Sequence, residues 1–176
     1  MPAAFVAMQD YVDANLSDLR SCVLPGVPEV LAALRGNGHL VGLLTGNLSR
    51  IAMAKMRHSG LDAYFHTGGF GEESEIRSHL VPAAIANAMS AVGHPLSPGR
   101  TVVIGDTPLD VEAGRIHGTR TVAVATGIVS EQDLRAAGPD LFFPSFEDPE
   151  RAVEEMENLV GHLSRHPPLF WTGGYW

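Results

Sequence analysis

Short apolar runs alternate with amphipathic segments along most of the 176-residue chain. Residues 40–44 (LVGLL), 101–104 (TVVI) and 121–125 (TVAVA) are almost continuously apolar, which is typical of strands buried on both faces of a parallel sheet. Residues 141–143 form a candidate edge strand. The segments with helical spacing and end signals are 3–20, 28–35, 49–58, 80–91, 108–116, 130–137 and 149–163. Strands that alternate with helices predict an α/β fold, with a Rossmann-like parallel sheet flanked by helices.

The two ends of the chain differ from this pattern. Residues 1–24 hold one amphipathic segment, a Leu-Pro-Gly break follows at residues 24–26, and residues 25–165 hold the alternating core. Residues 166–176 contain two prolines, two glycines and four aromatic side chains without a regular period. We therefore predict an irregular tail outside the core, whose removal should leave the thermal stability nearly unchanged. Its aromatic side chains could form an interaction patch or simply pack on a neighbouring surface.

Two features between the strands qualify the helix prediction. Residues 66–77 are rich in Gly, Glu and Ser and indicate a loop. Pro82 lies early in the helix expected over 80–91, and we place it in the first turn, where a missing N–H is tolerated. Gly60 is expected to end the helix over 49–58.

The composition excludes several classes of partner. Lys and Arg total 12 against 20 Asp and Glu, a formal net charge of -8, so the chain has no general attraction for nucleic acid or an anionic membrane. Cys22 is the single cysteine, which excludes an internal disulfide or a cysteine metal cluster and favours a reducing, cytoplasmic compartment. Residues 1–8 are apolar but lead into Gln9 and Asp10 without a basic stretch, so they predict neither a signal peptide nor a membrane span.

The clearest candidate for chemistry is the sequence GDTPLD at residues 105–110. An apolar strand ends there in a turn that carries Asp106 and Asp110, four residues apart. Ligands of open α/β sheets bind at the carboxyl ends of strands, so these carboxylates lie where a site is expected. Oxygen ligands of this kind suit Mg²⁺, which takes one or two carboxylates, waters and substrate phosphates. The alternative is that Asp106 only caps the following helix.

A second candidate is the Thr45-Gly46-Asn47 sequence, which also follows an apolar strand and precedes a helix. Backbone N–H groups at a helix start, together with a Thr hydroxyl and an Asn amide, can bind an anion such as a phosphate. The alternative is a simple helix cap by Asn47 or Ser49.

A phosphate also needs a cation, and Arg77 is the third candidate, because a guanidinium offers a two-pronged contact to phosphate oxygens. Lys55 is the only lysine of the chain. It lies about 9 Å along its expected helix from the helix start, too far to reach a phosphate at Thr45 easily. Arg77 could equally be a solvated surface side chain.

Taken in chain order, these motifs resemble the haloacid dehalogenase-like phosphatases. The sequences LLTGN, GLDAYFHTGGFG and GDTPLDV are similar to phosphoglycolate-phosphatase-like members, and the resemblance covers roughly residues 20–148. It implies that Thr45 is the phosphate-binding hydroxyl residue and that Arg77 stands where the family has a Lys or Arg. It further implies that Asp106 and Asp110 are an acidic Mg²⁺-binding pair, and that Thr45, Gly46, Asn47 and Arg77 contact the substrate.

One departure from the family pattern concerns catalysis. The family begins with an apolar strand that ends in DxDxT, whose first Asp attacks phosphorus and whose second acts as acid and base. No segment here has that form; Asp10-Tyr11-Val12-Asp13 does not match it. Residues 1–20 instead resemble the last helix of the family's small cap, so the chain is expected to be an N-terminally truncated member. The missing strand is the central one, and its absence should leave two inward strand edges unpaired.

The resemblance implies a Mg²⁺-dependent phosphatase of small phosphorylated metabolites. Without the nucleophilic Asp we expect this chain to be inactive alone, either as a fragment of an active hydrolase or as a noncatalytic phosphate- or Mg²⁺-binding protein. A dinucleotide-binding α/β protein is the weakest alternative, because no Gly-x-Gly-x-x-Gly follows a strand. The substrate and the oligomeric state are left open.

Overall fold

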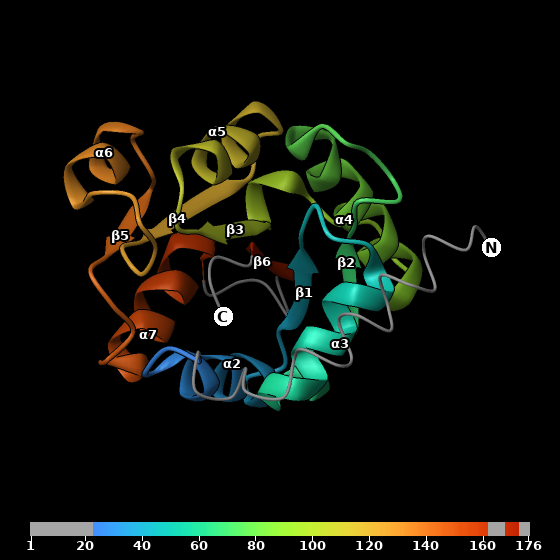
Figure 1. The fold of residues 1–176 in the computed structure, drawn as a ribbon, viewed down its shortest axis with the longest axis horizontal. Helices are drawn as coiled ribbons and strands as arrows, with labels where there is room; N and C mark the ends of the chain where they lie inside the picture. The colour runs from blue at the N-terminus through green and yellow to red at the C-terminus, as the bar shows by residue number, and fades with distance from the viewer. Residues whose placement is uncertain (1–22, 162–167, 173–176) are drawn as a thin grey trace.

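The computed structural model describes residues 23–161 and 168–172, which form an α/β domain around a parallel six-stranded sheet (Figure 1). The spatial order of the strands is β2-β1-β6-β3-β4-β5, and every neighbouring pair is parallel. This confirms the predicted fold class. The strands are β1 (Leu40–Leu44), β2 (Thr67–Gly69), β3 (Val102–Gly105), β4 (Arg120–Val124), β5 (Leu141–Phe143) and β6 (Pro168–Thr172).

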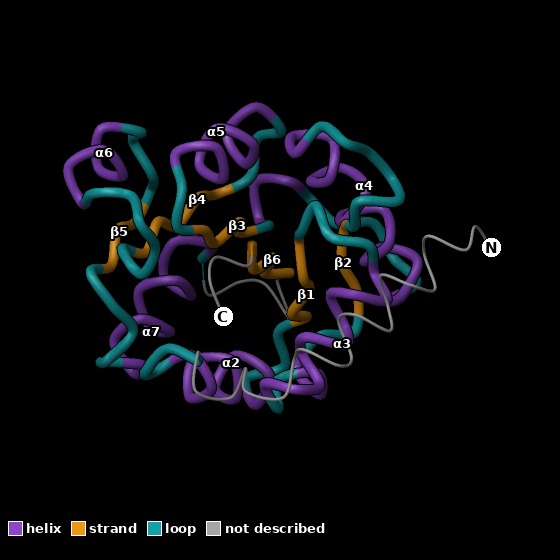
Figure 2. The backbone as a smooth tube through the Cα atoms, in the orientation of Figure 1, coloured by secondary structure: helices purple, strands orange, loops and turns teal. Residues whose placement is uncertain are grey.

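Helices cover both faces of the sheet, so that the strands lie in a middle layer (Figure 2). One face packs against the two helices before and after β1 and the helix after β5. The opposite face packs against the helix before β3 and the helices that follow β3 and β4. The α-helices are α2 (Val27–Gly36), α3 (Ser49–Ser59), α4 (Arg77–Val92), α5 (Pro108–Ile116), α6 (Glu131–Ala136) and α7 (Pro149–Val160). Two short 3₁₀ turns, η2 (Asp62–Tyr64) and η3 (Pro98–Arg100), complete the described elements.

Side-chain caps and proline fix where several helices begin. Thr107 forms a reciprocal capping box at the start of α5, where Pro108 is the first helical residue. Asp148 caps α7 by accepting a hydrogen bond from the backbone N–H of Arg151 at 3.1 Å, and Pro149 follows it. These signals place both helix starts at the carboxyl ends of the strands that precede them.

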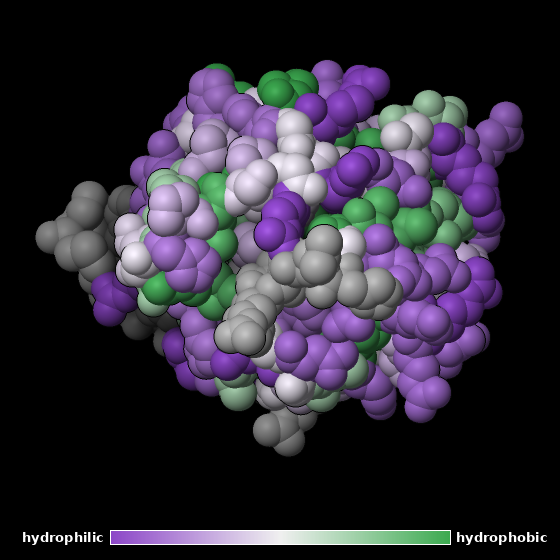
Figure 3. All heavy atoms as spheres, turned by 180° about the vertical axis from the view of Figure 1, so that it is seen from behind, coloured by the Kyte–Doolittle hydropathy of each residue, from purple (hydrophilic) through white to green (hydrophobic). Residues whose placement is uncertain are grey.

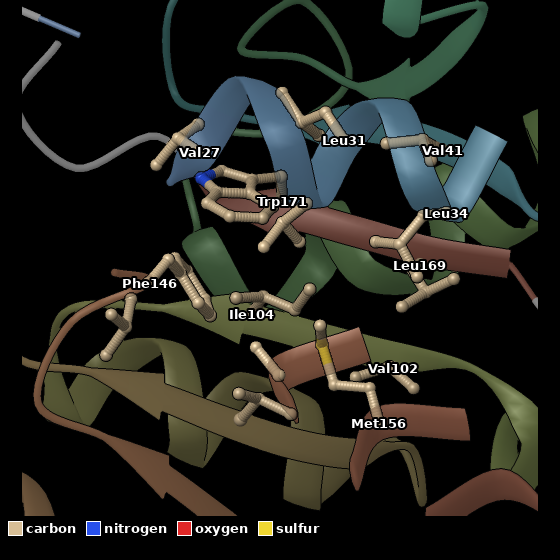
Figure 4. Close-up of a cluster of buried hydrophobic side chains, with 14 of the residues drawn as sticks. Val27, Leu31, Leu34, Val41, Val102, Ile104, Phe146, Met156, Leu169 and Trp171 are labelled. Carbon is tan, nitrogen blue, oxygen red and sulfur yellow. The ribbon is translucent and has the colours of Figure 1, made fainter. Parts of the chain in front are cut away.

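The larger core cluster lies between the sheet and the α2–α7 side (Figure 4). Val27, Leu31 and Leu34 of α2 face the sheet, and Met156 of α7 packs against the same cluster. Trp171 lies in its middle, with its ring centroid 5.2 Å from that of Phe146. Such a buried aromatic pair contributes about 0.5–1.5 kcal/mol beyond the area that it removes from water.

The centre of the sheet differs from the sequence-based expectation. We predicted that residues 166–176 form an irregular tail and that the core lacks its central strand. The tail prediction is wrong for Pro168–Thr172, because this segment forms β6 and pairs in parallel with β1 on one side and β3 on the other. No described strand precedes β1, so the central position is filled by a later segment, and the expectation of unpaired edges is wrong. All five residues of β6 are buried. The two inward strand edges are therefore paired.

The neighbours of β6 leave room for its side chains. A Cβ atom at Gly42 of β1 would lie 2.6 Å from the Phe170 ring, so only glycine fits opposite this phenylalanine. Phe170 is fully buried on the α4–α5 face, whereas Leu169 and Trp171 enter the cluster on the α2–α7 face. Pro168 is the first residue of β6, a position where a missing N–H is tolerated.

Smaller corrections concern the segment before β3. Residues 67–69 form the edge strand β2 instead of belonging entirely to a loop. Helix α4 begins at Arg77 instead of residue 80, so Pro82 is its sixth residue and lies beyond the first turn. Gly60 ends α3 as predicted, with a left-handed φ of 77°. The helix predicted over 3–20 lies outside the described residues.

The surface is mostly hydrophilic when the molecule is seen from behind, with hydrophobic areas of limited extent between polar side chains (Figure 3). None of the described helices is both long and apolar enough to cross a membrane.

We predict that Phe170→Ala lowers the free energy of unfolding by about 3–5 kcal/mol, because it leaves a cavity beside Gly42 in the middle of the sheet. Urea denaturation would measure this change. Ile116→Ala is the matched control, because Ile116 is 60 % exposed and its truncation should change stability by no more than about 0.5 kcal/mol. A loss below about 1 kcal/mol for Phe170→Ala would place β6 outside the folded core.

Candidate functional site

Three strand ends meet at the carboxyl edge of the sheet. Leu44 of β1 and Ile104 of β3 are in register with the adjacent β6 residues Thr172 and Trp171, respectively. The ends of β1 and β3 therefore lie at the same level, two strand spacings apart, or about 10 Å. Thr45 directly follows the first of these strand ends, and Asp106 follows Gly105 at the end of β3. This confirms that both strands belong to one parallel sheet.

Both carboxylate oxygens of Asp110 accept hydrogen bonds. It is 1 % exposed, and its Oδ1 accepts a hydrogen bond of 2.7 Å from Nε of Arg77, which also forms an ion pair with it. Its Oδ2 accepts hydrogen bonds from the Thr107 hydroxyl at 2.7 Å and from the Thr107 backbone N–H at 3.1 Å. The buried charge is thus compensated by a guanidinium and by a helix N-terminus.

Asp106 has a different environment, although it is also buried, with 6 % exposure. No side chain among residues 23–161 and 168–172 donates a hydrogen bond to its carboxylate. Burial raises the pKa of Asp106, and the negative charge of Asp110 raises it further, whereas the Asp106 backbone N–H and Arg77 act in the opposite direction. Gly127 lies directly over this carboxylate, because a Cβ there would be 2.3 Å from Asp106 Oδ2.

The Thr45 loop supplies two polar groups. The Thr45 backbone N–H is already bonded to the Gly69 carbonyl at 2.9 Å, but its hydroxyl accepts hydrogen bonds from the backbone and the side-chain N–H of Asn47, each at 3.2 Å. With its lone pairs occupied, this hydroxyl is left to donate its own proton. Gly46 and Asn47 are exposed beside it, and no heavy atom lies within 4 Å of a Cβ built at Gly46.

The start of α3 is already occupied by a carboxylate. Glu72 accepts hydrogen bonds from the Ser49 backbone N–H at 2.8 Å and from the Ser49 hydroxyl. Burial alone would raise the pKa of Glu72, but the hydrogen bonds from Ser49 and from the Glu72 backbone N–H together outweigh it and lower the pKa. An anion at this edge would therefore depend on the Thr45 hydroxyl and the Asn47 amide more than on the first N–H groups of α3.

The sequence motifs thus supply most of the site but not all of it. The structure brings Arg77 and Asp110 into contact and places Thr45 and Asp106 at the same edge of the sheet. Sequence reasoning did not identify Gly127, whose role depends on a close approach that no motif marks. It also missed Thr172, whose hydroxyl donates a hydrogen bond of 2.8 Å to the Ile104 carbonyl. The continuous apolar sequence Leu169-Phe170-Trp171 before Thr172 could have indicated a buried strand that ends at this residue.

Sequence comparisons connect this arrangement with known proteins. Residues 3–118 match the family model of the haloacid dehalogenase-like hydrolases. The chain is 30% identical over 152 residues to a phosphoglycolate phosphatase of Nitrosococcus oceani, an alignment that covers 86% of this chain and 63% of the relative. It is 32% identical over 116 residues to an N-acetylmuramic acid 6-phosphate phosphatase of Pseudomonas aeruginosa, covering 61% of this chain and 46% of the relative.

Solved structures show the same fold. A haloacid dehalogenase-like family protein from Streptococcus pneumoniae superposes with a TM-score of 0.62 at 18% identity, covering 74% of this chain and 58% of the other. A β-phosphoglucomutase from Clostridium difficile gives a TM-score of 0.62 at 16% identity, covering 77% of this chain and 56% of the other. This chain spans about three fifths of the length of the first phosphatases that it matches.

We predict that Arg77→Met lowers the free energy of unfolding by about 2 kcal/mol, because it leaves the Asp110 carboxylate buried without its cation. The loss is smaller than for a fully buried pair, since the Arg77 side chain is 34% exposed. Adding Asp110→Asn should recover part of the loss. Arg120→Met is the control: this arginine is 48% exposed in its pair with Asp140, and its loss should cost under about 1 kcal/mol. Equal losses for both arginines in urea denaturation would contradict this role of Arg77.

Proposed function

This chain belongs to the haloacid dehalogenase-like hydrolases, and we propose that it binds phosphate esters of small metabolites at a phosphatase site but does not hydrolyse them by itself. The family resemblance supports the reaction class, and the phosphatases among its relatives support a small phosphorylated ligand. The acidic net charge of -8 supports a ligand other than nucleic acid or an anionic membrane. A cytoplasmic location fits the single cysteine.

The observation that carries the proposal is the identity of the central strand. In the family pattern, the strand that lies between the counterparts of β1 and β3 ends in the nucleophilic Asp. Here β6 occupies that position, and residues 161–176 contain no Asp or Glu. Covalent phosphoryl transfer needs a nucleophile in line with the leaving group, and β6 supplies only the Thr172 hydroxyl, which is buried and donates to a backbone carbonyl.

The proposal includes Mg²⁺, and the environment of Asp106 fits such an ion. Its carboxylate is buried, has a raised pKa and lies near a second negative charge, so a divalent cation would offset both the burial and the repulsion. Asp110 is less available, because Arg77 and Thr107 already occupy its two oxygens. We therefore assign direct metal contact to Asp106 and a supporting position to Asp110. When bound, the ion would neutralise charge on the phosphate oxygens.

The remaining side chains would orient the ester. The Thr45 hydroxyl can donate to a phosphate oxygen, and the exposed Gly46 and Asn47 flank it without steric hindrance. Arg77 is anchored through Nε to Asp110, and its partly exposed guanidinium can direct further N–H groups to the phosphate. These groups bind and position a phosphate, but binding alone does not lower the barrier to hydrolysis.

A second possibility is that the chain is a portion of an active hydrolase. The coverage of about three fifths of the matched phosphatases favours it, because an additional segment could supply the nucleophilic Asp. Such a segment would have to replace β6 between β1 and β3, since each edge of those strands accepts one partner at that position.

We predict that the purified chain shows no Mg²⁺-dependent hydrolysis of an aryl phosphate or of 2-phosphoglycolate above background, while calorimetry detects weak binding of Mg²⁺ and inorganic phosphate. Asp106→Asn should abolish the Mg²⁺ binding. Asp140→Asn, a carboxylate beside the amino end of β4, should leave it unchanged. Mg²⁺-dependent turnover that disappears with Asp106→Asn would refute the noncatalytic proposal.

We further predict that an added N-terminal strand ending in DxDxT gives activity only if it expels β6. In a Trp176→Phe background, Trp171 is the sole tryptophan, and its emission should shift to longer wavelength when it leaves the core. Activity without that shift would show that β6 does not occupy the central position. A shift without activity would instead count against the phosphatase chemistry.

A further inference from the structure

We propose that Asn47 is a positioning residue, which sets the direction of the Thr45 hydroxyl proton and thereby makes this hydroxyl a donor to a phosphate. The inference rests on the proposed function, because it concerns the phosphate that Thr45 would bind. It goes beyond that function by giving Asn47 an effect on the ligand that passes through Thr45, in place of a direct contact of its own.

The Thr45 hydroxyl has an incomplete set of hydrogen bonds. Its oxygen accepts from the Asn47 backbone N–H and from the Asn47 side-chain amide, each at 3.2 Å. A hydroxyl has two lone pairs and one proton, so these bonds use its accepting capacity and leave the proton. Within residues 23–161 and 168–172, no group accepts that proton, although Thr45 is only 8% exposed. A buried donor without an acceptor is costly, so an acceptor atom of a ligand would complete the set.

The backbone around Asn47 is anchored by the segment that follows β2. The Gly71 N–H donates a hydrogen bond to the Asn47 carbonyl at 2.9 Å. A Cβ at Gly71 would lie 2.2 Å from the Gly46 carbonyl oxygen, so a side chain at this position would prevent the approach. The Thr45 N–H, in turn, donates to the Gly69 carbonyl at 2.9 Å. With both ends of the segment anchored, the fold itself directs the Asn47 donors toward the Thr45 hydroxyl.

The two hydrogen bonds from Asn47 have different consequences. The backbone N–H occupies one lone pair of the Thr45 oxygen and does not depend on the side chain at position 47. The side-chain amide occupies the second lone pair, and it thereby removes the other orientations of the O–H bond. A donor that is oriented before the ligand arrives loses less freedom on binding. Deleting the amide should therefore weaken phosphate binding even though the Thr45 hydroxyl is still present.

The start of α3 does not replace the Thr45 hydroxyl as a donor. The Ser49 backbone N–H already donates to the two carboxylate oxygens of Glu72, at 2.8 and 3.0 Å. The Leu48 side chain at the N-cap of α3 forms no capping hydrogen bond. The first N–H group of the helix is thus bonded within the chain, and the negative charge of Glu72 opposes a second anion there. A phosphate at the end of β1 would depend more strongly on Thr45.

The opposite orientation of the Asn47 amide would have the opposite effect. With the amide oxygen facing Thr45, the hydroxyl would donate to Asn47, and its proton would be withheld from a phosphate. Removing the side chain would then release the proton and strengthen phosphate binding. The sign of the change in affinity therefore identifies which residue is the donor.

The test measures the affinity for inorganic phosphate at a constant Mg²⁺ concentration, by phosphorus NMR titration of the full chain. We expect Asn47→Leu, which keeps a similar size without a donor, to raise Kd about fivefold, the effect of one typical hydrogen bond. Asn37→Leu is the matched control, because this exposed asparagine donates to Glu157 at 2.9 Å before the start of β1, and Kd should not change. Asn47 is also exposed, so both variants should keep Tm within about 3 °C. A Kd for Asn47→Leu equal to or below that of the unaltered chain would overturn the inference.

A second background separates an effect through Thr45 from a direct contact. In a Thr45→Val chain, adding Asn47→Leu should change Kd by less than about 1.5-fold, because the effect requires the hydroxyl. The same fivefold loss in both backgrounds would mean that Asn47 contacts the phosphate itself, and would overturn this inference while leaving the proposed function intact. An unaltered chain that does not bind phosphate would contradict the proposed function, and this inference with it.

Discussion

Every other feature of this fold depends on the pairing of β1 and β3 with one shared central strand. Both strands are buried along almost their whole length, so unpaired N–H and C=O groups on their inward edges would lose hydrogen bonds to water without replacing them. β6 satisfies both edges at once. Its alternating side chains then join the two core clusters, with Phe170 on one face of the sheet and Trp171 on the other. The separation between Thr45 and Asp106 follows from the width of this strand.

Two carboxylates of the same type have different properties because their surroundings differ. The fold gives Asp110 a guanidinium, a hydroxyl and a backbone N–H, so its charge is part of the structure of the α4–α5 interface. Among the described residues no side chain donates a hydrogen bond to Asp106, and burial and the neighbouring Asp110 charge raise its pKa, so a bound cation would offset both effects. This difference is why we propose different roles for the two carboxylates of one short motif, an anchoring role for Asp110 and cation binding for Asp106.

Much of the fold could be predicted from the sequence, because continuous apolar runs and capping residues are local signals. The LVGLL and LFF segments form the strands that were expected, and the strand and helix around GDTPLD differ from their predicted bounds by at most one residue. β6 was missed because Pro168 and the glycines after Thr172 suggested a tail, although Pro is tolerated at a strand start. Pairing between strands distant in sequence has no local signature. For the same reason, the contact between Arg77 and Asp110 could be expected only from resemblance, and the close approach of Gly127 to Asp106 could not be expected at all.

The order in which the chain is made has a consequence for how it reaches this structure. The strand at the centre of the sheet follows all the others in sequence, so a ribosome releases both flanking halves before the element that joins them. Until then, β1 and β3 have unpaired backbone edges with an apolar gap between them. Such a surface recruits chaperones or pairs with another nascent chain. Folding of the core should therefore be slow, since the contacts that complete it connect residues more than sixty positions apart.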